Sequence, residues 1–82
     1  MHSAARTHQQ LGAELRRYRK KQNLTQAELS SLINKRQATI SSLESEGNAT
    51  LETLFAVLSA LDTELVLRPR SKSGRAKLGD IF

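Results

Sequence analysis

Apolar residues recur at helical spacing along this chain, and polar or turn-forming residues separate one apolar stretch from the next. Thr7 and Gln10 have capping-box spacing, which predicts a helix that begins near Thr7. Gly12 lies inside this helix and weakens it locally. The inward stripe of the helix consists of Leu11, Leu15 and Tyr18.

The stretch from Thr25 to Glu44 has the pattern of two short helices joined by a tight turn. Thr25 and Glu28 again have capping-box spacing. Asn34 tolerates the left-handed backbone of a sharp turn, so the turn is expected there. The predicted apolar face of the first helix is Leu29, Leu32 and Ile33, and that of the second is Ile40 and Leu43.

Beyond Glu44 the pattern predicts a loop over 45–48, a further helix and a short strand. Thr50 is the expected cap of the helix. Its apolar residues are expected to form core plus a dimer contact, and they are Leu51, Leu54, Phe55, Val57, Leu58 and Leu61. The strand spans 63–68, ends before Pro69, and contains Leu65, Val66 and Leu67. A lone strand has open edges, so we expect it to pair with its copy in a homodimer.

Composition limits the kinds of protein this chain can be. The 82 residues carry a formal net charge of +5, and we expect one small domain over 1–69 with a flexible basic tail over 70–82. No apolar run approaches a membrane span and no signal peptide is evident, so a cytoplasmic protein with a polyanionic partner is expected. A basic run near the end of the first helix either complements the helix dipole or contacts phosphates; it consists of Arg16, Arg17, Arg19, Lys20 and Lys21.

Residues that carry catalytic or metal chemistry are scarce. The chain has no Cys, and its two histidines, His2 and His8, have no accompanying ligands, so no metal site is predicted. The serines lack a neighbouring base and there is no Gly-rich phosphate loop. We therefore expect no enzyme activity and no cofactor.

The stretch 25–44 resembles the Cro/C1-type (XRE) helix-turn-helix family, whose motif is roughly TQxELAxxxGxxxxxISxxE. Ser30 and Asn34 depart from the motif, and each keeps a small or turn-tolerant residue at its position. The matching residues are Thr25, Gln26, Glu28, Leu29, Ile40, Ser41 and Glu44. The resemblance implies an all-α, four- to five-helix, lambda-repressor-like domain that places its second motif helix in the DNA major groove.

This layout assigns roles to the residues of the motif. Gln37 is the expected base reader, since its amide can bond adenine N6 and N7 together, and Ala38 can touch a thymine methyl group. Ser41 and Ser42 are candidates for a base edge or a phosphate, and Thr39 faces the groove or a phosphate. The expected phosphate contacts are Gln26, Lys35 and Arg36. The resemblance also implies a structural ion pair between Arg19 and Glu44.

The second half, TLETLxxxLxALxxxLxL with a basic tail, is similar to HipB-type antitoxins. That similarity implies a homodimer joined by the C-terminal strand, a palindromic operator and a HipA-type kinase toxin as partner. Two alternatives remain open: a stand-alone phage-type or metabolic regulator, and a module that inhibits a toxin without reading DNA. The apolar tip of the tail either contacts the toxin or has no role, and the basic tail residues alternatively follow DNA; the tip is Leu78, Ile81 and Phe82.

Overall fold

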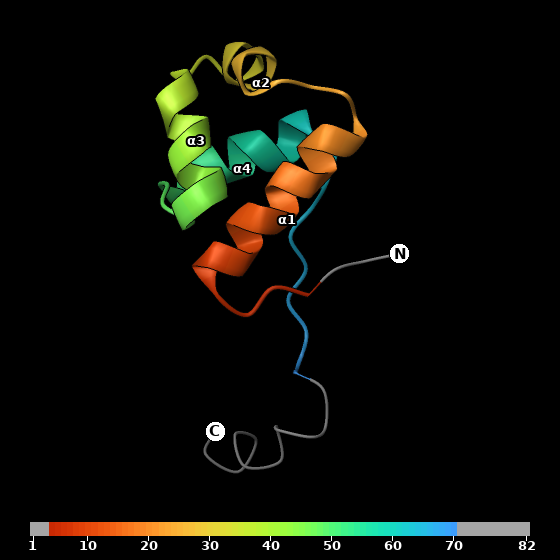
Figure 1. The fold of residues 1–82 in the computed structure, drawn as a ribbon. Helices are drawn as coiled ribbons and strands as arrows, with labels where there is room; N and C mark the ends of the chain where they lie inside the picture. The colour runs from red at the N-terminus through yellow and green to blue at the C-terminus, as the bar shows by residue number, and fades with distance from the viewer. Residues whose placement is uncertain (1–3, 71–82) are drawn as a thin grey trace.

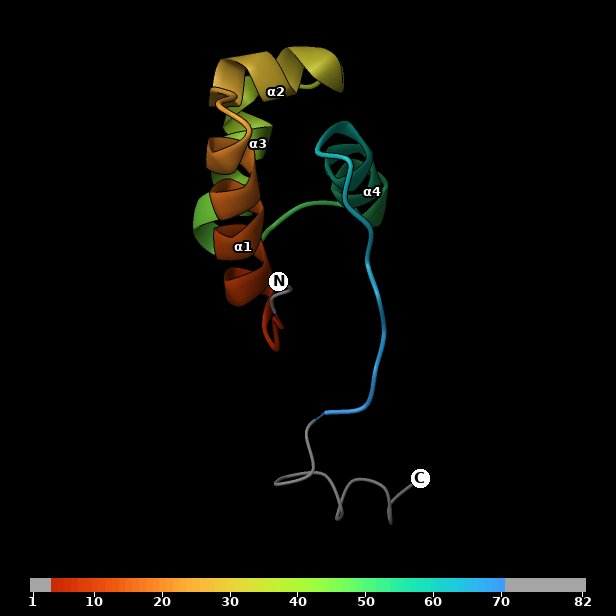
Figure 2. The ribbon, with the colours of Figure 1, turned by 90° about the vertical axis from the view of Figure 1, so that its right-hand side faces the viewer.

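This computed structural model describes residues 4–70, and this part of the chain contains four helices. They are α1 (His8–Lys21), α2 (Gln26–Leu32), α3 (Gln37–Glu46) and α4 (Leu51–Ala60). Helices α1 and α3 lie side by side, α4 lies on one side of this pair, and α2 crosses one end of the molecule (Figures 1 and 2). The predicted all-α class of four to five helices is confirmed, with four helices in the described residues.

Local capping chemistry fixes where three of the helices begin. The Thr7 hydroxyl accepts the Gln10 backbone N–H at 3.1 Å, and that of Thr50 accepts the corresponding N–H of Thr53 at 3.1 Å. Thr25 and Glu28 form the complete predicted capping box, with distances of 3.0 and 2.8 Å. Each cap satisfies a backbone donor that the first helical turn leaves without a partner.

Each of the first three helices is followed by a residue whose backbone has the left-handed conformation. Asn23 has φ of 60° after α1, and Asn34 has φ of 56° in the turn between α2 and α3, as predicted for that position. Gly47 has φ of 74° and follows α3, which runs on to Glu46. The loop predicted over 45–48 was therefore wrong at its start: the left-handed glycine, and not the serine before it, ends the helix.

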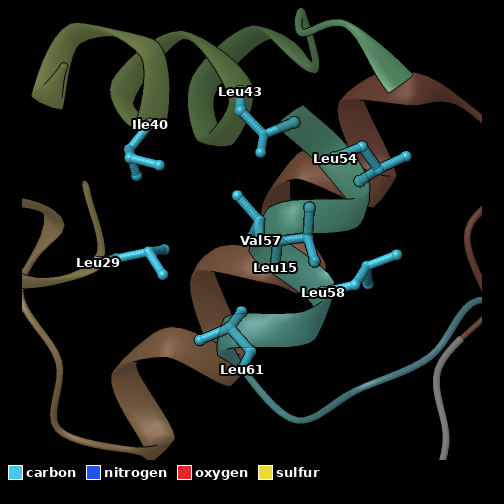
Figure 3. Close-up of a cluster of buried hydrophobic side chains, with 8 residues drawn as sticks. All are labelled: Leu15, Leu29, Ile40, Leu43, Leu54, Val57, Leu58 and Leu61. Carbon is cyan, nitrogen blue, oxygen red and sulfur yellow. The ribbon is translucent and has the colours of Figure 1, made fainter. Parts of the chain in front are cut away.

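One apolar core holds the four helices together (Figure 3), and the eight side chains in it are at most 8% exposed. They are Leu15, Leu29, Ile40, Leu43, Leu54, Val57, Leu58 and Leu61. Leu32 was predicted on the inward face of α2 but is 62% exposed. Leu29 and Ser30 mark the buried side of this seven-residue helix, and Leu32 lies on the flank away from it.

Two glycines allow backbones to approach more closely than a side chain would permit. A Cβ at Gly12 would collide with the Leu43 carbonyl oxygen, so α1 and α3 cross at this residue. A Cβ at Gly47 would likewise collide with the His8 carbonyl group. The Gly12 that weakens α1 as an isolated helix is therefore what permits α1 to pack on α3.

The predicted strand is absent from residues 4–70. After α4 the chain leaves the helices with Leu65, Val66 and Leu67 exposed by 45%, 65% and 90%, and it pairs with no other described segment. The strand is absent for a simple physical reason. A strand is defined by backbone hydrogen bonds to a neighbouring strand, and a single copy of this chain does not supply one. The tail residues 71–82, including Leu78, Ile81 and Phe82, lie outside the described part.

Candidate nucleic-acid interface

The turn between α2 and α3 sets the two helices at a fixed angle. The backbone N–H of Lys35 donates to the Ser30 carbonyl at 2.9 Å, which closes the turn around the left-handed Asn34. Ile40 and Leu29, the least exposed side chains of their helices, join α3 and α2 to the same core. The sequence pattern thus produces a helix-turn-helix in which each helix is anchored to the core by a buried apolar side chain.

The predicted base-reading residues lie on the first turns of α3. Gln37, Ala38 and Ser41 are exposed, whereas Thr39 and Ser42 are half-buried. Lys35 and Arg36 are exposed immediately before the helix, and Arg36 occupies the N-cap position without a capping side-chain hydrogen bond. The arrangement presents an amide, a methyl group and a hydroxyl beside two cations, which suits readout of base edges flanked by phosphates.

A buried ion pair joins α1 to α3 behind this surface. Arg19 Nε donates to Glu44 Oε2 at 2.6 Å and Arg19 Nη2 donates to Oε1 at 3.0 Å, so the pair is bidentate. Both residues are 6% exposed. A further Arg19 donor, Nη1, reaches the Leu24 carbonyl at 2.6 Å. The hydrogen bond to Glu44 raises the pKa of the Arg19 guanidinium, so the cation persists through the accessible pH range.

Gln26 belongs to the same cluster. It is the first residue of α2, and its Nε2 donates to Glu44 Oε1 at 3.1 Å. Glu44 therefore accepts hydrogen bonds from both α1 and α2 while it belongs to α3. Gln26 was expected to contact a phosphate, and the structure places its amide nitrogen on Glu44, where it helps to hold the three helices in register.

A second contact ties the opposite end of α1 to α3. The Nδ1 atom of His8 lies 2.9 Å from the carbonyl oxygen of Glu46, next to the close approach of Gly47. The sequence predicted no role for His8, because nothing near it along the chain indicates its distant partner, Glu46. Within residues 4–70, no group of three potential ligands gathers to hold a metal ion. No described helix has the length and apolar character that crossing a membrane requires.

The chain matches known proteins over most of its described length. The profile of the helix-turn-helix family matches residues 15–67. One solved structure, a complex of a HipB variant with the O2 20mer, contains a chain that is 32% identical to this one, with a TM-score of 0.81. The match covers 87% of this chain and 100% of that chain. A complex of HipA, HipB, O2 and O3 contains a chain 31% identical, with a TM-score of 0.79, covering 85% of this chain and 100% of that one. No curated protein sequence matches the chain.

Proposed function

Since this chain belongs to the Cro/C1-type helix-turn-helix family of DNA-binding, non-enzymatic domains, we propose that it is a sequence-specific repressor that also serves as the antitoxin of a HipA-type kinase. The observation that carries the DNA-binding part is the exposed first turn of α3, with Gln37 and Ala38 beside Lys35 and Arg36. A surface of this kind reads bases in the major groove while its cations hold the backbone.

A homodimer is part of the proposal. Leu65, Val66 and Leu67 follow α4 as an exposed apolar segment, and α4 adds Leu51 and Phe55, which are 72% and 53% exposed. The extended segment has open backbone groups, so it gains from pairing with its copy across a two-fold axis, and the exposed side chains of α4 add apolar surface to the same contact. The resulting dimer would present two α3 helices to the two halves of a palindromic operator.

The antitoxin part of the proposal rests on the relatives. Several solved neighbours are HipB complexes, and one of these also contains HipA. HipB proteins bind operator DNA and HipA, and we extend both partners to this chain. The apolar tail tip, Leu78, Ile81 and Phe82, is proposed as an additional toxin contact; it lies outside the described residues.

The antitoxin role is tested by expressing the HipA-type kinase of the same genome with and without this chain. We expect growth arrest by the kinase alone, relief on co-expression, and a stable complex on purification. Gln37→Ala should keep the relief while losing repression, because the DNA-reading side chain is separate from the proposed toxin contacts. Growth arrest that persists with wild-type chain present, and no complex, would leave a stand-alone regulator as the function.

A further inference from the structure

The second half of α1 carries more exposed positive charge than the α2–α3 turn. Four exposed cations follow one another in two helical turns, whereas the turn contributes Lys35 and Arg36. The four are Arg16, Arg17, Lys20 and Lys21. The proposed function does not use them, so their placement on the molecule decides what they can bind.

The four cations divide into two pairs on different sides of α1. Arg16 and Lys20 follow Gly12 at intervals of four residues, so the three form one row along the helix. That row starts where Gly12 touches the α3 backbone, and it runs beside Arg19, which reaches Glu44 of α3. Arg16 and Lys20 therefore flank the contact between α1 and α3.

Arg17 and Lys21 lie one row further from α3 and have other contacts. The Arg17 guanidinium lies 5.5 Å and the Lys21 ammonium 5.7 Å from the centre of the Tyr18 ring. Arg17 also pairs with Glu14 at 2.7 Å. Within residues 4–70, no hydrogen bond or ion pair engages the side chains of Arg16 and Lys20.

Arg16 and Lys20 lie on the same side of the molecule as the exposed surface of α3 and the start of α2. Figure 2 shows α4 on one side of the α1–α3 pair, whereas α2 begins over the pair itself and runs from there toward the α4 side. Gln26, at that beginning, bonds the same Glu44 that Arg19 holds. In Figure 1 this shared face of α1, α3 and α2 is turned toward the viewer, with α4 behind it. A duplex docked on α3 and the start of α2 thus has the Arg16–Lys20 row alongside it.

We propose that Arg16 and Lys20 are a second phosphate-binding site, which holds the DNA backbone beside the base pairs read by α3. The inference rests on the proposed DNA-binding function and adds a sequence-independent contact to it. The competing explanation is that cations at the end of α1 only complement its dipole. That explanation predicts that all four cations affect the stability of the helix similarly. It also predicts that neither pair affects the affinity for DNA more than the other.

The test compares two double variants of the full chain, Arg16→Gln/Lys20→Gln and Arg17→Gln/Lys21→Gln. Each removes two positive charges from the same helix, and Gln has a helix propensity close to that of Arg and Lys. Binding to a mixed-sequence duplex is measured by fluorescence anisotropy over a series of salt concentrations. A melting curve for each variant verifies that it is folded.

The wild type should bind the duplex with an affinity that falls as salt rises. Losing Arg16 and Lys20 should flatten the slope of log affinity against log salt by about 0.9 per phosphate contact, or about 1.8 per protomer. The Arg17/Lys21 variant should keep nearly the wild-type slope. Equal flattening in both variants, or none in the first, overturns this inference and leaves the DNA-binding function standing. A wild type that binds no duplex overturns both.

Discussion

Replacing Glu44 by Ala should destabilise the domain by about 3–5 kcal/mol, the usual cost of leaving a buried charge without its partner. Arg19 is 6% exposed and makes two hydrogen bonds to the Glu44 carboxylate. The variant would bury that guanidinium with only the Leu24 carbonyl as a partner, and Gln26 would lose its acceptor too. Since small domains have a total stability of about 5–15 kcal/mol, much of the fold's margin would be lost.

Thermal or urea unfolding followed by circular dichroism measures this effect. The matched control is Glu14→Ala, which removes the carboxylate of the Glu14–Arg17 pair, whose side chains are 30% and 48% exposed. Ion pairs in contact with solvent contribute little, so the control should unfold near the wild-type midpoint. If Glu44→Ala unfolds at the same point as Glu14→Ala, the buried pair does not hold α1 and α3 together.

Gly12→Val should destabilise the domain by about 3 kcal/mol, at the upper end of what overpacking a core contact costs. Any Cβ at residue 12 meets the Leu43 carbonyl oxygen, and a backbone atom cannot move aside as a flexible side chain can. Gly12→Ala gains about 1 kcal/mol of helix propensity, yet it should still be less stable than wild type because the same Cβ collides. The two variants should therefore rank Ala before Val in stability.

Ala13→Val is the control for Gly12→Val, because Ala13 is the exposed neighbour on the same helix. It carries the β-branched cost to helix propensity, which is below about 1 kcal/mol, and no collision with α3. The same unfolding curves measure all three variants. A Gly12→Ala protein more stable than wild type would mean that α1 and α3 do not approach as closely as described.

Local signals in the sequence predicted three of the helix starts and the turn at Asn34. Thr7, Thr25 and Thr50 cap their helices as expected, since a hydroxyl and a backbone N–H a few residues away suffice for a cap. Asn34 adopts the predicted left-handed conformation for an equally local reason. All eight residues of the apolar core also lie at positions that helical spacing predicted, although the same spacing included Leu32, Leu51 and Phe55, which are exposed.

What the sequence did not predict depends on distant parts of the chain or on another molecule. Gly12 is required by a carbonyl of α3, and His8 finds its partner in Glu46, so neither role has a signature near the residue itself. The hydrogen bond from the Gln26 amide nitrogen to Glu44, which lies far along the sequence, has no local signature either. The strand predicted at 63–68 requires a neighbour outside the single chain.

The most direct test of the central claim, that α3 reads a two-fold symmetric DNA site, is selection of bound duplexes from a random-sequence pool. Wild-type protein should enrich two inverted half-sites whose centres are about 34 Å apart along the duplex, as two α3 helices of a dimer require. Gln37→Ala should lose preference at one base pair in each half-site and about 1–3 kcal/mol of affinity for the selected sequence. A wild-type pool with no common sequence, or an unchanged preference in Gln37→Ala, would contradict the assignment of α3 as the recognition helix.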